Sequence, residues 1–256
     1  MDRRTFLANM IGTGICSKLP LCLFSEASTK KGCAGDWPRD QMMRLRPNWF
    51  YNWGRQTSQN IDIPFIPMAW GSVATTELGE VDRTSGVLLG FNEPDHGEQA
   101  NMSVGEALAL WPRLEATGLR LGSPVPAYSE GKWINEFMAG AHDKRVDFMT
   151  FHWYGLPIAD DFLGALDSMY TRFGKPIWIT EFACADWEAE SQNRKPSYTV
   201  DDVSRFMAAV IPRLESLDYV EKYAWMSVDQ DPSEDSSVLF NRNGTLTPLG
   251  VQYSRY

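Results

Sequence analysis

Short apolar runs alternate along this chain with longer stretches in which apolar residues recur at helical spacing. The runs expected to form strands span residues 48–53, 65–70, 87–92, 119–125, 147–154, 176–181 and 221–228, with a weaker candidate at 237–240. The helical stretches span residues 103–117, 132–141, 159–173 and 200–217. Such frequent alternation predicts an α/β fold with a parallel sheet, and about eight strands close naturally into a (β/α)8 TIM-type barrel.

Local signals refine the helices of this barrel. Ser103 and Glu106 have the spacing of a capping box, and Thr199 is expected to cap the longest helix. Pro212 lies inside that helix and is expected to kink or split it, because proline cannot donate the hydrogen bond of its turn. The connections 54–64 and 71–86 are short for a helical crossover, so the barrel is expected to be reduced, with one or two short or missing helices.

Length and charge limit the domain organisation and the partners. We expect residues 29–256 to form a single domain and to act as a monomer. The net charge is −9, and because the first 28 residues carry +1, the remainder carries −10. This charge argues against nucleic acid or an anionic membrane as a partner. It does not affect a neutral polysaccharide, and ten tryptophans offer flat faces on which sugar rings can stack.

The N-terminal segment has the features of an export signal. Arg3 and Arg4 form a twin-arginine pair, and a moderately apolar stretch follows from residue 8 to 24. We therefore expect residues 1–28 to direct the protein to the periplasm or outside the cell, the alternative being a disordered cytosolic tail. The stretch is too short and interrupted to span a membrane. Cys33 and Cys184 would remain after export, either as a disulfide or as two thiols.

Two glutamates that end apolar runs are the strongest candidates for chemistry. Glu93 follows the run 87–92, and Glu181 ends the run 176–181. Because strand residues alternate, we expect Phe91 to share a side with Glu93 and Ile179 to share a side with Glu181, each facing the barrel interior. Either glutamate alone could be a helix cap or a loop acid. Together, at the carboxyl ends of two parallel strands, they match the carboxylate pair of glycoside hydrolysis, in which one protonates the leaving oxygen.

Polar residues near these strand ends could support the pair. His152 and Tyr154 are two apart at the end of another run and should point the same way. A tyrosine there can donate to a carboxylate, and a histidine can bind a hydroxyl or orient a carboxylate; the alternative is a purely structural pair. Asn92 could also face the cleft and bind a sugar hydroxyl. No Cys/His spacing suggests zinc, and we expect neither a metal nor an organic cofactor.

Several tryptophans occupy places where they could contact sugar. Trp53 and Trp70 end the first two runs, Trp187 lies in the polar segment after Glu181, and Trp225 ends the run near 222–226. Trp225 is expected to form the floor of the subsite for the reacting sugar, and the other three are expected to be stacking platforms. Trp178 alternates opposite to Glu181, so we expect it to pack under the helices.

These motifs together resemble glycoside hydrolase family 128, a family of endo-β-1,3-glucanases among the retaining barrel glycosidases. The resemblance rests on Leu89–Asp95 (LGFNEPD), Phe151–Tyr154 (FHWY) and Trp178–Phe182 (WITEF), with Asn52–Trp53 and Phe65–Met68 in support. It extends from about residue 48 to the C-terminus. Asn-Glu-Pro alone is only moderately specific, whereas the longer motif followed by Thr-Glu-Phe is much more specific.

The resemblance implies roles for both glutamates and a class of substrate. Glu93 would be the general acid/base and Glu181 the nucleophile, acting on a β-1,3-glucan polysaccharide or oligosaccharide such as laminarin or curdlan. The two glutamates of the family follow the fourth and seventh strands, whereas our count gives the third and sixth, which indicates an overlooked or missing strand. Retention of configuration would require carboxyl groups about 5–5.5 Å apart.

Two other functions stay open at this point. The first is the same chemistry on another β-glycan, such as mannan or a β-1,4-glucan, because linkage preference depends on the shape of the cleft. The second is a non-catalytic glycan-binding barrel, which would keep the tryptophans but need neither carboxylate.

Overall fold

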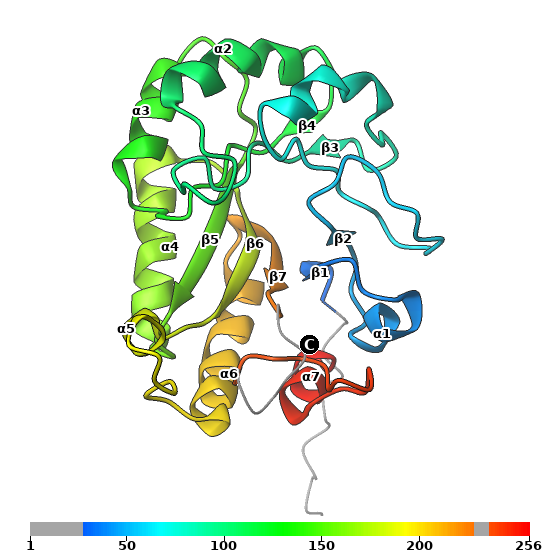
Figure 1. The fold of residues 1–256 in the computed structure, drawn as a ribbon, viewed down its shortest axis with the longest axis vertical. Coiled ribbons are helices and arrows are strands. Elements are labelled where there is room, and N and C mark those ends of the chain that lie inside the picture. The colour runs from blue at the N-terminus through cyan, green and yellow to red at the C-terminus, as the bar shows by residue number, and fades with distance from the viewer. Residues whose placement is uncertain (1–27, 228–235) are drawn as a thin grey trace, which may run out of the picture.

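Parallel strands alternate with helices in the computed structural model, which describes residues 28–227 and 236–256 (Figure 1). The strands are β1 Lys31–Ala34, β2 Phe50–Tyr51, β3 Val87–Leu88, β4 Arg120–Leu121, β5 Met149–Gly155, β6 Ile177–Cys184 and β7 Val220–Trp225. The helices are α1 Arg39–Arg44, α2 Val104–Glu115, α3 Lys132–Gly140, α4 Ala159–Phe173, α5 Trp187–Ser191, α6 Val200–Ser216 and α7 Pro248–Tyr253, with 3-10 turns η1 Val73–Thr76 and η2 Leu78–Glu80.

The strands form two parallel ladders rather than one closed regular sheet. Five strands pair in the order β2-β1-β7-β6-β5, and β3 pairs with β4. Isolated parallel bridges join the two ladders: Phe50 to Phe65 and Met68 to Leu89 on one side, and Gly122 to Phe148 on the other. The neighbour order is that of a (β/α)8 barrel, so the expected α/β fold with a parallel sheet and a reduced barrel is confirmed.

The overlooked strand is β1. Its sequence, Lys-Gly-Cys-Ala, has a polar start that hides it, yet all four residues are buried. Lys31 Nζ donates to the Tyr253 carbonyl oxygen at 3.1 Å and lies 5.4 Å from the centre of that ring, which compensates its burial. With β1 and the bridged segment 65–68 counted, Glu93 follows the fourth strand position and Glu181 lies in the seventh, as in the family.

The weaker candidate strand at residues 237–240 is wrong. Within the described part of this region, Phe240 makes one isolated antiparallel bridge to Leu246, and the segment belongs to a turn that precedes α7. Thr247 caps α7 by accepting the Gly250 amide.

The long helices begin where their capping residues predict. The Ser103 side chain accepts the Glu106 amide at the start of α2, and Thr199 and Asp202 form a reciprocal capping box at the start of α6. Pro212 does not split α6, which runs unbroken to Ser216. Its apolar face, including Phe206 and Val210, is buried, and this packing offsets the hydrogen bond lost at the proline.

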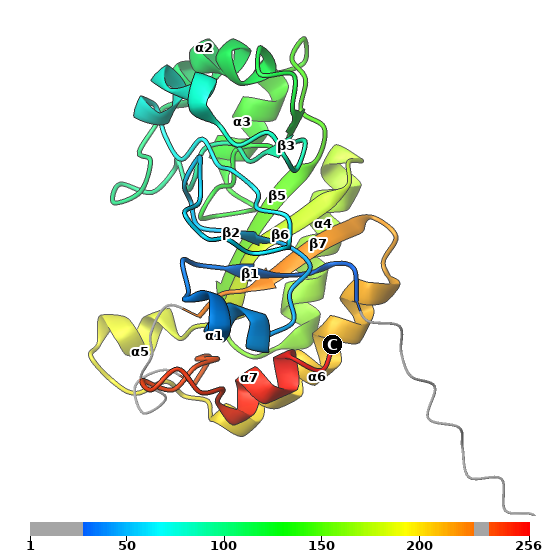
Figure 2. The same cartoon turned by 90° about the vertical axis from the view of Figure 1, so that its right-hand side faces the viewer.

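Helices α4 and α6 lie along the outer face of β5, β6 and β7 (Figures 1 and 2). The rings of Phe162 from α4 and Phe206 from α6 contact Trp153 of β5, and Phe162 stacks on Phe182 of β6. Connections 54–64 and 71–86 contain no α-helix, and only η1 and η2 occupy the second, as expected for a reduced barrel.

The two cysteines that are expected to remain after export both lie in the described part of the chain. Cys33 and Cys184 are buried and form no disulfide with each other, and burial raises the pKa of the Cys33 thiol to about 12.

The expected export signal falls almost wholly on residues 1–27, outside the described residues. Among residues 28–227 and 236–256, no helix has the length and apolar character needed to cross a lipid bilayer.

Candidate active site

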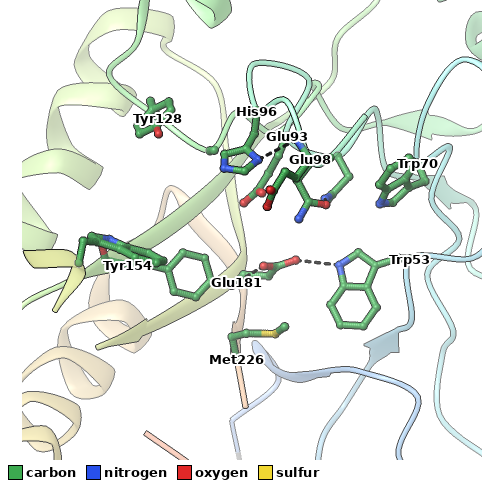
Figure 3. A pocket seen from close by; sticks show the side chains of 13 residues that line it. Trp53, Trp70, Glu93, His96, Glu98, Tyr128, Tyr154, Glu181 and Met226 are labelled. Atoms are coloured by element: carbon green, nitrogen blue, oxygen red, sulfur yellow. Dashed lines mark hydrogen bonds between the residues drawn. The ribbon is translucent and has the colours of Figure 1, made fainter. Parts of the chain in front are cut away.

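A cavity of about 900 Å³ opens at the carboxyl ends of the strands (Figure 3). Glu93 and Glu181 reach it from the two separate ladders and face each other across it. Its other lining residues are Trp53, Trp70, Asn92, His96, Glu98, Gln99, Ala127, Tyr128, Tyr154, Trp187 and Met226. The carboxylates thus share one sugar-sized space although 88 positions separate them in the sequence.

A β-bulge in β6 directs Glu181 into this cavity. Phe151 of β5 pairs with Ile179 but His152 pairs with Glu181, so Thr180 is an extra residue against β5. Tyr223 and Trp225 of β7 show the same shift, pairing with Ile179 and Phe182. One extra residue reverses the alternation of side chains beyond it.

Three expectations from strict alternation are wrong, and the first two are wrong because of this bulge. Trp178 does not pack under the helices: its ring stacks on Phe148 at 4.6 Å inside the barrel, and its Nε1 donates to Glu221. Ile179 therefore does not share a side with Glu181. In the other ladder, Phe91 contacts Trp111 of α2 rather than the barrel interior, so it does not share a side with Glu93.

Three hydrogen-bond donors surround the Glu181 carboxylate. Tyr51 Oη donates to Oε1 at 2.6 Å, and Trp53 Nε1 donates to the same oxygen at 2.8 Å. Tyr154 Oη donates to Oε2. Burial, followed by the charge and hydrogen bond of Glu181, raises the pKa of both tyrosines well above the usual value. Both phenols therefore stay protonated and donate to the carboxylate, an arrangement that stabilises its ionised form.

Glu93 has a different environment. Its backbone has φ 42°, a left-handed conformation that non-glycine residues rarely adopt, and its amide donates to the Val125 carbonyl oxygen at 2.7 Å. Its carboxyl group has one side-chain partner among the described residues, His152 Nδ1, at 2.9 Å from Oε1. Strained backbone of this kind is concentrated at functional sites, where it aims a side chain.

His152 lies between the two carboxylates. Its side chain is fully buried, with Nδ1 at Glu93 Oε1 and Nε2 3.3 Å from Glu181 Oε1. One atom from each of these three residues lies within 4.8 Å of the others. Carboxylates and imidazole are also metal ligands, but Glu181 Oε1 already accepts from Tyr51 and Trp53. We therefore interpret the trio as a hydrogen-bonded arrangement rather than a metal site.

Asn92 presents an amide to the cavity, as expected. Its Nδ2 donates to Gln99 Oε1 at 3.3 Å, while its buried Oδ1 has no hydrogen-bond partner among the described residues. A buried acceptor without a partner is costly, so Oδ1 is suited to accept a bond from a ligand. Gln99 was not anticipated, because it comes from the turn that follows the strand rather than from its end.

Aromatic side chains form the rim of the cavity. Trp53, Trp70 and Trp187 line it as expected, and Trp187 Nε1 donates to the Tyr154 carbonyl oxygen at 3.0 Å. Trp187 is 57% exposed, so its ring is available to a ligand. Tyr128, which is 64% exposed, was overlooked although it follows β4 at the same end of the barrel. Asp95 fixes its loop by accepting the Ala127 and Tyr128 amides.

Trp225 does not form the floor of this cavity. It is 1% exposed, its ring contacts Phe182 and Phe206 in the layer between the sheet and α6, and its Nε1 donates to the Ser237 carbonyl oxygen. The shifted register of β6 pairs Trp225 with Phe182, and both side chains face the helices. Met226, the next residue, lines the cavity instead.

A family model described as the glycosyl hydrolase catalytic core matches residues 33–253. The chain belongs to this family. The resemblance to glycoside hydrolase family 128 is confirmed by solved structures of that family. A subgroup I endo-β-1,3-glucanase from Amycolatopsis mediterranei, in complex with laminaritriose, is 35% identical with a TM-score of 0.73, covering 89% of this chain and 99% of that one. A subgroup II endo-β-1,3-glucanase from Sorangium cellulosum is 30% identical with a TM-score of 0.75, covering 88% and 97%.

A curated relative shows the same core within a longer protein. Alkali-sensitive linkage protein 1 of Schizosaccharomyces pombe is 28% identical over 227 residues, which cover 84% of this chain. The match covers 41% of that relative, so the chain spans about two fifths of its length.

Proposed function

We propose that this glycosyl hydrolase core cleaves β-1,3-glucosidic bonds in a neutral glucan and retains the configuration of the anomeric carbon. The observation that carries the proposal is the approach of Glu93 and Glu181: one oxygen of each lies within 4.8 Å of the other in a single cavity. Retaining glycosidases place their carboxyl groups about 5–5.5 Å apart, whereas inverting enzymes need about 6.5–9.5 Å to admit a water.

The surroundings of the two glutamates support different proposed roles. Glu181 accepts from Tyr51, Trp53 and Tyr154, which favours a carboxylate that stays ionised and can attack carbon. Glu93 has a single side-chain partner among the described residues and lines the open cavity, which suits a group that must give up and later regain a proton.

The reaction would proceed in two steps. Glu93 protonates the glycosidic oxygen as a Glu181 oxygen attacks the anomeric carbon; the C–O bond to the leaving sugar breaks and a glycosyl ester forms. Glu93, now ionised, removes a proton from water, whose oxygen attacks the same carbon and displaces Glu181. Both residues return to their starting states, and no redox partner is needed.

The lining of the cavity supports a neutral glucan as the substrate. Trp70, Tyr128 and Trp187 offer exposed ring faces, and the Asn92 Oδ1 acceptor can bind a hydroxyl. Two related endo-β-1,3-glucanases have the same fold, which favours β-1,3-glucan over the alternatives of mannan and β-1,4-glucan.

The test compares wild type with Glu93→Gln, Glu181→Gln and Glu98→Gln on laminarin, curdlan, mannan and a β-1,4-glucan, with reducing ends as the readout. We expect cleavage of laminarin and loss of at least about 10³-fold in the first two variants. Glu98→Gln is the matched control, because it makes the same change on the cavity wall and should leave turnover nearly unchanged. NMR of the first product anomer tests retention.

Other results would contradict the proposal. Normal turnover in Glu93→Gln or Glu181→Gln would contradict the role proposed for that residue. A first product with inverted configuration would contradict the role of Glu181 as a nucleophile. Binding of laminari-oligosaccharides without turnover in wild type would favour the non-catalytic glycan-binding alternative.

We also propose that residues 1–28 export the protein and that the catalytic barrel, residues 29–256, is a monomer. Arg3 and Arg4 carry the export proposal. Fusing residues 1–28 to a reporter, with Arg3→Lys/Arg4→Lys as the control, tests the first; light scattering of the purified protein tests the second.

A further inference from the structure

His152 is fixed in place by burial and by its position on β5. Its side chain has no exposed surface, its carbonyl oxygen accepts from Ser129 Oγ at 2.7 Å, and it follows directly on Phe151, where the β5–β6 register shifts. The groups that face its ring are Glu93, Glu181 and the phenol of Tyr154. Its position on β5 therefore fixes the imidazole between the two catalytic carboxylates.

The two ring nitrogens differ in their contacts. Nδ1 makes a hydrogen bond of 2.9 Å with Glu93 Oε1. Nε2 lies 3.3 Å from Glu181 Oε1 but has no aligned hydrogen bond with any described group. In a neutral imidazole one nitrogen donates and the other accepts. This geometry assigns the hydrogen to Nδ1, where an acceptor is aligned, and the lone pair to Nε2.

We propose that His152 is a positioning residue that decides which oxygen of Glu93 carries the catalytic proton. By donating from Nδ1 to Oε1, it keeps that oxygen as an acceptor and leaves the proton for Oε2, which has no side-chain partner among the described residues. When Oε2 gives its proton to the glycosidic oxygen, the same Nδ1–H stabilises the carboxylate that remains. Oε2 is then free to accept the proton of the attacking water.

This inference rests on the proposed function and makes Glu93, not Glu181, the group through which His152 acts. The side-chain nitrogen of asparagine can take the place of Nδ1, whereas that of glutamine lies closer to Nε2. We therefore expect His152→Asn to keep kcat/KM on laminari-oligosaccharides within about 10-fold of wild type, and His152→Gln and His152→Leu to lose about 100-fold or more. KM should change little in all three.

A substrate with a very good leaving group separates action through Glu93 from action through Glu181. Cleavage of a 2,4-dinitrophenyl β-laminaribioside needs no proton on the leaving oxygen, so kcat/KM of His152→Leu should fall by less than about 5-fold on it. An equal loss on both substrates would overturn the inference, because it would place the effect on the nucleophile.

The pH profile and the folded state complete the test. The alkaline limb of kcat/KM on laminari-oligosaccharides should shift in His152→Gln and stay close to wild type in His152→Asn. Thermal unfolding and binding of laminaritriose report whether each variant is folded, and His152→Asn keeps the test decisive where His152→Leu unfolds. Wild-type rates in a folded His152→Leu, with Glu93→Gln inactive, would overturn this inference alone. Absence of cleavage by wild type would instead remove the proposed function.

Discussion

The two ladders of the barrel hold their glutamates in contrasting ways. Strands β5, β6 and β7 have six to eight residues each, and they place Glu181 at 5% exposure among three hydrogen-bond donors. Strands β3 and β4 have two residues each, and Glu93, which follows β3, has a left-handed backbone and one side-chain partner among the described residues. In the proposed mechanism, the ladder with extensive pairing thus fixes the group that reaches carbon, while the ladder with little pairing carries the group that exchanges protons.

This contrast has a physical reason. A nucleophile gains from preorganised donors, because they need no rearrangement during the reaction. A general acid/base must be protonated before the first step and must accept a proton in the second. A full set of donors would favour the charged form, which leaves less of the acid protonated and makes the carboxylate a weaker base.

The largest expected effect separates the two glutamates on a 2,4-dinitrophenyl β-laminaribioside. Glu181→Gln should lower kcat/KM by at least about 10⁴-fold, because no leaving group replaces the nucleophile. Glu93→Gln should lose less than about 100-fold, since that leaving group needs no proton. Steady-state kinetics measure both, and equal losses would contradict the assigned contrast.

The donors around Glu181 should come next in size. Tyr154→Phe or Tyr51→Phe removes one hydrogen bond to a charged group, worth about 1.5–3 kcal/mol, so kcat should fall about 10–100-fold. Tyr128→Phe is the control, because its ring lines the same cavity at 64% exposure, and its rate should stay within about 3-fold. A control that lost as much would show that the donors are not the cause.

A smaller effect should follow from the rim. Trp187→Ala should raise KM for laminari-oligosaccharides about 10-fold with little change in kcat, because it removes a stacking face away from the bond that breaks. Trp225→Phe should instead lower the thermal midpoint and leave KM unchanged, since Trp225 packs against α6. A raised KM in a folded Trp225→Phe variant would indicate that Trp225 contacts the substrate, which would contradict its placement outside the cavity.

The last expected effect is on stability rather than on rate, and it concerns the five-stranded ladder. Burial, and then the charge of Arg46, lowers the pKa of Lys31 from 10.5 to about 8. The unfolded chain therefore binds more protons between these values, and the free energy of unfolding should rise with pH from about 8 to 10.5, by roughly 3 kcal/mol. Urea unfolding of wild type and Lys31→Met measures this, and the variant should lack the rise. An equal slope in wild type and Lys31→Met would show that other titrating groups cause the rise in the free energy of unfolding.

Much of the fold and the pair of glutamates could be predicted from sequence because local signals agree with the tertiary structure. The capping residues Ser103 and Thr199 mark where α2 and α6 begin, and alternation in β5 correctly places His152 and Tyr154 together. These features depend on residues close to one another in the chain.

The remaining features depend on distant contacts. β1 is a strand because it pairs with β2 and β7, and its buried Lys31 donates to the Tyr253 carbonyl oxygen, 222 positions away. Trp225 and Trp178 are misplaced by strict alternation because the extra residue Thr180 is set by pairing with both neighbours of β6. Gln99 and Tyr128 lie in loops whose positions follow from the bonds of Asn92 and Asp95.

The extra residue in β6 has a consequence for how this chain can tolerate change in length. Replacing Thr180 by another small side chain leaves the residue count of the strand intact, so Glu181 keeps its direction. Deleting Thr180 would restore an uninterrupted pleat and turn the carboxylate outward, against the apolar surfaces of α4 and α6. One missing codon there would therefore be far more damaging than most single replacements, although no reacting atom is lost.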